Sequence, residues 1–418
     1  MSPRRAAYAA VAAAAVVPRL AVLAVERGDI VSSFTEKSWD FAQTFVASGT
    51  YGFIVGVPSA STQPLYGFFL VPIVWIFGTS WVAVGLVQTA VAAATAVVVY
   101  EIGCRVLSRR AALVAALIAT LQPYLVWHDV HVNRELLDQL LGAAMMLLTL
   151  VACTRRTLAW AAALGAVGGL AILSNTRLVA LPLVLAGYLL WARVGPVAAV
   201  AVVACAVLVV TPWVVRNRVQ VGCFALTTDS KALWKANNLA TYDTLSRGLW
   251  IDDVPDLPGA PPTPEMAASI WKANHQRVAV DECAQMRLYR GKVTSFWRHH
   301  PGEKAKLAAQ ATWMLWSPAA ERSEGGPDKG GGVEIARKVV EPLYMVPVYV
   351  LAVTGLFLVA TPFRVLALCF LGYETLAAWV FAGTTRYRVP WDFVLALLAA
   401  AALTRVPFPP FRPSSQKR

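Results

Sequence analysis

The chain has 418 residues, of which 57% are hydrophobic and only 15% are charged. An average soluble domain is about half apolar and a quarter charged, so this composition excludes an ordinary soluble globular protein. The formal net charge of +13 would suit a nucleic-acid partner on a soluble protein. However, the sequence has no basic helix interleaved with aromatic residues, so we expect a membrane protein that binds no nucleic acid.

Apolar segments, taken in chain order, predict about ten transmembrane helices, because each is long enough to cross a hydrocarbon core roughly 30 Å thick. The first segment follows a basic lead and resembles a signal peptide, but it lacks a convincing cleavage site, so we expect it to be a retained helix. The predicted spans are residues 6–25, 80–100, 111–127, 136–153, 157–174, 178–193, 196–214, 343–361, 363–382 and 389–404.

Lysine and arginine residues in the short loops predict the orientation, because such residues concentrate on the cytoplasmic side. Ten crossings place both termini and all these basic groups in the cytoplasm, as expected for a multi-pass plasma-membrane protein. The segment Leu65 to Gly78 has only 14 residues, so we expect it to be re-entrant or interfacial. The cytoplasmic groups are Arg4, Arg5, Arg105, Arg109, Arg110, Arg155, Arg156, Arg193, Arg364, Arg405, Lys417 and Arg418.

The predicted fold class is therefore an all-α polytopic membrane protein with three parts. Residues 1–214 form an N-terminal transmembrane module, whose first outer loop, 26–64, contains interfacial helices. Residues 215–342 form one α-rich extracytoplasmic insertion with an interfacial segment near Trp313 to Trp316. Residues 343–418 supply the last transmembrane helices and a short basic cytoplasmic tail.

Two of the six cysteines, Cys223 and Cys283, fall in the outer insertion. Disulfides persist in extracytoplasmic compartments. We therefore hypothesise that these two cysteines pair, with two free thiols as the alternative.

The first outer loop offers candidate carboxylates. Glu36 and Asp40 are four residues apart, and on the short helix predicted over 35–47 they would share one face. A carboxylate there could be a general base that removes a proton from an acceptor hydroxyl. The alternative is a solvated loop face.

A second polar cluster follows the third predicted span and ends at the start of the fourth. Arg134 could bind phosphate, because a guanidinium group matches phosphate oxygens bidentately. Glu135 and Asp138 begin the fourth span. The remaining members could hold a divalent metal, with interfacial hydrogen bonding as the alternative, so no cofactor is firmly predicted. Those weak metal candidates are His128, Asp129 and His131.

Further cations lie on the outer face, where the positive-inside rule disfavours them. Arg177 joins the fifth and sixth spans, and Arg386 and Arg388 flank Tyr387 before the last span. A lipid phosphate would explain this placement, and anchoring to lipid headgroups is the alternative. The polar lining continues in the segment after the seventh span, with Lys231, Lys235 and Asn238.

The sequence contains no phosphate loop, G-x-S-x-G element, paired C-x-x-C or dinucleotide fingerprint. Nucleotide-dependent chemistry on the cytoplasmic side is therefore not indicated. An outer-face enzyme that works without nucleotides needs an activated lipid.

Several short motifs, in their order and spacing, resemble the GT-C polytopic glycosyltransferases, which include protein O-mannosyltransferases, aminoarabinose transferases and bacterial dolichyl-phosphate-mannose-mannosyltransferase-like enzymes. The first outer loop and the turn after it carry the earliest of these motifs, and the residues before the last span carry the final one. The motifs are Phe41-Ala42 with Ser48 to Phe53, Gln63 to Tyr66, Gly169 to Ala171 with Arg177, Pro212 to Asn217, Asn237-Asn238, His300 to Gly302 and Arg386 to Pro390.

The resemblance implies a hexosyl- or pentosyltransferase that moves a sugar from a polyprenyl-phosphate donor to a glycan, lipid or protein acceptor. It implies that Glu36 or Asp40 is the base, with Glu36 favoured, and that Glu135 or Asp138 is a second acid. It also implies that Arg177, Arg386 and Arg388 meet the donor phosphate.

Two other functions remain as alternatives. A transporter or flippase for a lipid-linked or anionic solute would show inverted repeats and broken helices in matching halves, and neither is seen. A non-catalytic assembly subunit would keep the fold without the chemistry.

Overall fold

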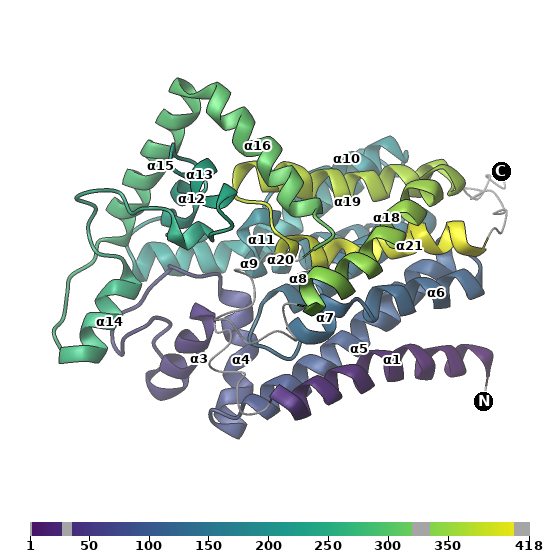
Figure 1. Ribbon diagram of the computed structural model, residues 1–418, viewed down its shortest axis with the longest axis horizontal. Helices are drawn as coiled ribbons and strands as arrows, with labels where there is room; N and C mark the ends of the chain where they lie inside the picture. Colours follow the sequence, from purple (N-terminus) through teal and green to yellow (C-terminus); the bar gives the residue numbers. More distant parts are fainter. Residues whose placement is uncertain (1, 27–35, 320–334, 405–418) are drawn as a thin grey trace.

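A computed structural model describes residues 2–26, 36–319 and 335–404. These residues form helices joined by turns, and their one β feature is an isolated bridge between Ile54 and Val57. The long helices lie side by side along the long axis of the molecule (Figure 1). This confirms the predicted all-α polytopic fold. The predictions for residues 27–35 of the first outer loop and for the basic tail from Arg405 to Arg418 fall outside the described residues.

Seven of the helical stretches in the described ranges are long and apolar enough to cross a membrane. They correspond to seven of the ten predicted spans. They are α1 (Pro3–Glu26), α5 (Trp81–Val106), α8 (Glu135–Arg155), α11 (Pro196–Gln220), Lys338–Leu358 with α18 (Glu341–Leu358), α19 (Thr361–Val380), and Thr385–Thr404 with α20 (Thr385–Arg388), η5 (Val389–Trp391) and α21 (Asp392–Thr404).

The other three predicted spans are shorter helices. The stretch predicted over 111–127 is broken, because Pro123 disfavours helical backbone at Gln122, whose ψ is 122°. It forms α6 (Arg109–Thr120) and α7 (Pro123–His128). The span predicted over 157–174 forms α9 (Leu158–Ser174), and the span predicted over 178–193 corresponds to η1 (Thr176–Leu178) and α10 (Leu181–Trp191). The segment expected to be re-entrant or interfacial is α4 (Pro64–Phe77), of 14 residues, which runs across the direction of the long helices (Figure 1).

The bundle packs closely around small residues. Helix α9 lies against α8 and α11, and a Cβ added at Gly165 would come within 2.3 Å of the Val202 carbonyl oxygen of α11. Similarly, a Cβ at Gly355 of α18 would approach the Leu398 carbonyl oxygen of α21 to 1.8 Å. Small residues at such contacts let helix backbones approach one another, as is typical in membranes. Helix α21 is held between α6 and α18 and is the most buried of the long helices.

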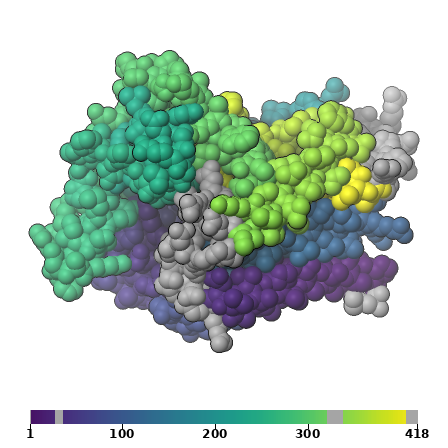
Figure 2. Space-filling view, in the orientation of Figure 1, coloured from purple at the N-terminus to yellow at the C-terminus, as the bar shows by residue number. Residues whose placement is uncertain are grey.

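Residues 215–319 of the insertion gather at one end of the molecule, whereas the start of α1 and the end of α21 lie at the other end (Figure 1). Figure 2 shows the same division, with the teal to green residues of the insertion forming one end. A disulfide joins Cys223, just past α11, to Cys283 on α15, which is the pairing hypothesised from the sequence. The helices of the insertion are α12 (Lys231–Lys235), α13 (Thr241–Ser246), η2 (Ile251–Asp253), α14 (Pro264–Asn274), α15 (Glu282–His299) and α16 (Pro301–Trp316), and a π-helical turn η4 (Ala336–Val340) precedes α18.

Candidate active site

The structure separates the two candidate carboxylates of the segment between α1 and α4. Helix α3 (Lys37–Ser48) begins one residue after Glu36, whose backbone is extended, with φ −101° and ψ 154°. Glu36 therefore lies outside the helix, and the prediction that it shares a helical face with Asp40 is wrong. Asp40 instead contacts Lys272 of α14, with 3.0 Å between carboxylate oxygen and ammonium nitrogen. Glu36 reaches Arg386 of α20.

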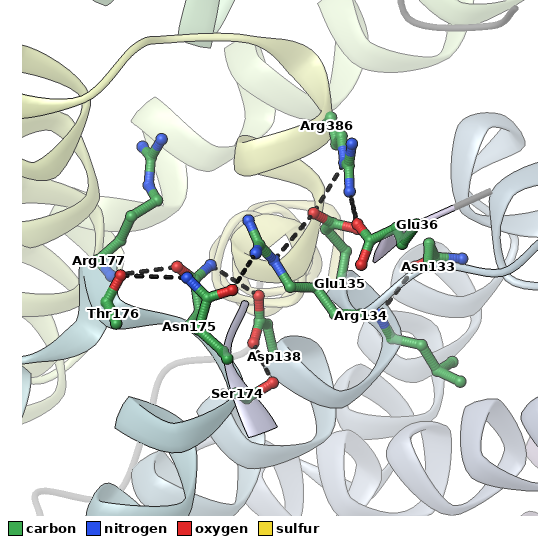
Figure 3. Close-up of polar contacts among 12 residues, drawn as sticks. Glu36, Asn133, Arg134, Glu135, Asp138, Ser174, Asn175, Thr176, Arg177 and Arg386 are labelled. Atoms are coloured by element: carbon green, nitrogen blue, oxygen red, sulfur yellow. Dashed lines mark hydrogen bonds and ion pairs between the residues drawn. The ribbon is translucent and has the colours of Figure 1, made fainter. Parts of the chain in front are cut away.

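Arg386 joins Glu36 to Glu135, the first residue of α8. Its Nε donates to Glu135 Oε1 at 2.8 Å, and its second terminal nitrogen donates to Glu135 Oε2 at 3.1 Å and also to Glu36. Figure 3 shows the three side chains pointing toward one another from three separate elements. All three are largely buried, and Glu135 is only 1% exposed. Two carboxylates thus share one guanidinium group.

Arg134 and Gln63 extend this cluster. A terminal nitrogen of Arg134 donates to Gln63 Oε1 at 2.8 Å, and Arg134 Nε lies 3.7 Å from Glu135 Oε1. Burial disfavours the charged form of Arg134, but the neighbouring Glu135 carboxylate outweighs this and raises the pKa of Arg134 above its ordinary value. Arg134 is therefore a permanent cation beside the shared Arg386.

Asp138 and Arg177 lie beside the cluster but face different partners. Asp138 accepts hydrogen bonds from Ser174 Oγ at 2.7 Å and from Asn175 Nδ2 at 2.8 Å. Arg177 turns away from Asp138 (Figure 3), donates to Glu374 of α19 at 2.9 Å, and lies 4.0 Å above the ring of Tyr387. Tyr387 therefore contacts the cation of Arg177.

The remaining predicted cations lie elsewhere. Arg388 is fully buried and pairs with Asp392 of α21 at 3.2 Å and with Glu341 of α18 at 3.3 Å. The structure does not bring Arg388 to Glu36. Lys231 and Lys235 pair with Asp256 within the insertion, and Asn238 makes local bonds around α12 and α13. None of these four residues contacts the Glu36–Arg386 cluster.

The three weak metal candidates do not converge. Asp129 is fully buried and accepts from Arg19 of α1 at 2.7 Å. His131 Nε2 lies 3.5 Å from Glu26, whereas His128 Nε2 lies 3.6 Å from Glu135. In the part of the chain that the structure describes, no three His, Cys, Asp or Glu side chains gather in a way that could hold a metal ion.

The sequence reasoning missed Arg19 and Glu374 as members of buried ion pairs. Both lie inside predicted transmembrane segments, at 1% and 2% exposure. Charged residues at membrane depth are costly and face protein partners, so their position within apolar runs was a usable signal. Gln63 was noted as part of a motif, but its bond to Arg134 could not be foreseen.

These features define a class: an all-α polytopic membrane protein with a cluster of acidic and basic side chains at the start of α8. Residues 60–215 match the model of the family described as dolichyl-phosphate-mannose-protein mannosyltransferase. The fold is similar to that of the oligosaccharyltransferase AglB from Archaeoglobus fulgidus in complex with an inhibitory peptide and a dolichol-phosphate, with TM-score 0.54, 12% identity, and coverage of 95% of this chain.

Two further structures are similar to this chain to different degrees. A second structure of the Archaeoglobus fulgidus oligosaccharyltransferase, tethered to an acceptor peptide, gives a TM-score of 0.51 at 13% identity and 95% coverage. The chain spans 50% and 49% of these two relatives. The structure of ArnT from Cupriavidus metallidurans bound to undecaprenyl phosphate gives a TM-score of 0.41 at 16% identity. The match covers 95% of this chain and 77% of that chain. No curated protein sequence matches this chain.

Proposed function

We propose that this protein is a membrane glycosyltransferase that moves a sugar from a polyprenyl-phosphate donor to an acceptor hydroxyl on the outer face of the plasma membrane. The observation that carries the proposal is the cluster of Glu36, Glu135 and Arg386. It joins the first outer loop, the start of α8 and the segment before α21. A base and a cation meet there where the bundle adjoins the outer insertion.

In the proposed reaction, Glu36 takes the proton of the acceptor hydroxyl. The acceptor oxygen then forms a bond to the anomeric carbon of the sugar, as the bond from that carbon to the phosphate oxygen breaks. The lipid phosphate leaves with the electron pair of the broken bond, and Arg386 and Arg134 stabilise the negative charge that develops on it. Glu135 orients Arg386 through two hydrogen bonds.

An apolar groove supports a lipid-linked donor. It has a volume of about 470 Å³ and opens beside α9, α10 and α11. Its wall includes Val179, two residues past Arg177, and Phe224 of the insertion. A site for a polyprenyl chain has to be apolar, and this groove meets that requirement.

The proposed orientation places both termini in the cytoplasm and the site outside. The start of α1 and the end of α21 lie at the opposite end of the bundle from the insertion, as this orientation requires (Figure 1). The Cys223–Cys283 disulfide supports an oxidising compartment for the insertion.

The test compares cells that lack the chain, cells that carry it, and cells that carry Glu36→Gln/Glu135→Gln. Lipid-linked sugars and envelope glycans are measured by mass spectrometry. We expect the first and third strains to accumulate one polyprenyl-phosphate sugar and to lose the matching glycan residue.

Unchanged lipid-linked sugars in the null strain would refute the proposal. Full restoration by the double variant would instead favour a transporter or a non-catalytic subunit, because neither needs a base.

A further inference from the structure

A polar pocket of about 380 Å³ lies between the start of α3 and the outer insertion. This volume is in the range of about 300 to 1,000 Å³ that is usual for small-molecule sites. Its wall comes from the start of α3, the residues before α4, the segment around α12, and the starts of α14 and α15. The charged groups of the wall are Lys37, Lys231, Lys235, Asp229, Asp252, Asp256 and Glu265.

The lysines of this pocket are already neutralised. Lys37 Nζ contacts Asp229 at 2.8 Å and Glu265 at 2.5 Å. Asp256 lies between Lys231 at 2.9 Å and Lys235 at 3.1 Å. Burial alone would raise the pKa of Asp229, but the nearby Lys37 ammonium group holds this pKa below its ordinary value. With three ammonium groups against four carboxylates, the wall offers no surplus positive charge to a phosphate.

One hydroxyl of the wall is open. Ser61 is 3% exposed, and its Oγ has no hydrogen-bond partner within the described residues. The other three hydroxyls of the wall each have one: Thr228 donates to Glu282, Ser230 accepts from Arg290, and Thr263 accepts from the Met266 backbone. A buried polar atom without a partner is costly, so the Ser61 hydroxyl calls for a ligand atom.

The pocket adjoins the proposed catalytic cluster. Lys37 of its wall directly follows Glu36, and Ser61 lies two residues before Gln63, which binds Arg134. Arg134 is near enough to Asp229 that each affects the pKa of the other. A molecule held in the pocket would therefore lie next to the proposed base.

We infer that this pocket holds the acceptor, and that the acceptor end is a neutral, hydroxyl-rich carbohydrate. A sugar hydroxyl both donates and accepts hydrogen bonds, which suits a wall that alternates ammonium donors with carboxylate acceptors. A lipid acceptor would need an apolar wall. A peptide acceptor bound as an added strand would need a sheet edge, and none lines the pocket among the described residues. This inference rests on the proposed glycosyltransferase function.

Ligand-observed saturation-transfer NMR on the full chain in lipid nanodiscs tests the inference. The probes are methyl α-D-mannopyranoside, methyl α-D-glucopyranoside and methyl α-D-arabinofuranoside, with inorganic phosphate and an acetylated Ser-Thr dipeptide amide as competitors. We expect at least one glycoside to bind and neither competitor to displace it. Ser61→Ala should weaken that binding roughly 3- to 10-fold, as expected for the loss of one hydrogen bond.

Ser269→Ala is the matched control, because Ser269 is exposed on α14 and lies outside the pocket wall. Ser61→Ala removes a hydroxyl that has no hydrogen-bond partner among the described residues, so we expect the variant to fold. A second variant, Asp256→Asn, removes the carboxylate that pairs with Lys231 and Lys235. The variant should therefore bind the anionic methyl α-D-glucuronide better, relative to the neutral glycosides, than the wild-type protein does.

Two results would overturn the inference: no glycoside binds, or the wild-type protein and Ser61→Ala bind equally. Displacement of the glycoside by the dipeptide would favour a protein acceptor instead. Normal consumption of the lipid-linked sugar without glycoside binding would overturn this inference alone. Glycoside binding without any change of lipid-linked sugars in the null strain would refute the proposed function and leave a sugar-binding site.

Discussion

Replacing Arg386 with glutamine should destabilise the folded protein strongly, because it removes the cation that two buried carboxylates share. Breaking a buried ion pair by deleting one partner costs about 3 to 5 kcal/mol. We expect the lower end of this range, because Arg134 Nε at 3.7 Å and His128 Nε2 at 3.6 Å stay close to Glu135. Glu36 and Glu135 would then repel each other across the vacated position.

The matched control removes a cation from an exposed pair. Lys272→Met breaks the contact with Asp40. The side chains of Lys272 and Asp40 are 63% and 38% exposed, so the free energy of unfolding should change by less than about 1 kcal/mol. Adding Glu135→Gln to Arg386→Gln should restore part of the loss, with a coupling energy of at least about 1 kcal/mol in a double-mutant cycle.

The assay is unfolding of the purified full chain by sodium dodecyl sulfate in mixed micelles, followed by tryptophan fluorescence, and it needs no identified substrate. Equal midpoints for the wild-type protein and Arg386→Gln would refute the shared-cation geometry. So would the absence of any compensation in the double variant.

Three further predictions concern the base, the disulfide and a half-buried lysine. Glu36→Gln should slow sugar transfer by about 10²- to 10⁴-fold, which is the usual contribution of a general base, whereas Asp40→Asn should leave the rate nearly unchanged. The rate is measured as consumption of the donor, and a larger loss in Asp40→Asn than in Glu36→Gln would assign the base to Asp40. Cys283→Ser removes the disulfide that closes a loop of 60 residues, and in the chain-entropy model this should lower the free energy of unfolding of the insertion by about 4 kcal/mol. Equal resistance of the wild-type protein to proteolysis before and after reduction of the disulfide would count against this prediction. Burial lowers the pKa of Lys304 to about 8 from its ordinary 10.5, so between these values the unfolded chain binds more protons and stability rises with pH. The melting temperature of the wild-type protein relative to Lys304→Met should therefore increase from pH 8 to pH 10, and a constant difference would contradict the argument.

The sequence predicted the bundle well because its signal is local. Uninterrupted apolar runs gave the positions of the long helices, and the limits of α9 and α8 differ from the prediction by one or two residues. The exact number of crossings was harder to predict, because Pro123 divides one apolar run into α6 and α7. Local composition does not show whether such a pair, or the 14-residue α4, crosses a bilayer.

Residues of the site were predicted better than their partners. The polar run before α8 drew attention to Arg134, Glu135 and Asp138, because ionisable residues near the membrane core usually have a function. The structure places all three in polar contacts. Their partners come from segments far away in the sequence, and the bond from Arg386 to Glu135 spans 251 positions. Periodicity failed at Glu36 because the helix starts one residue too late to include it.

Two consecutive residues, Glu36 just before α3 and Lys37 at its start, contact two different groups of side chains. Glu36 is tied to the cation of the membrane-side cluster, and Lys37 is tied to the carboxylates of the outer pocket. A ligand that displaced Lys37 from Asp229 would act on the backbone beside Glu36, because the two residues are adjacent in the chain. Occupancy of the polar pocket would therefore be coupled to the position of the proposed base.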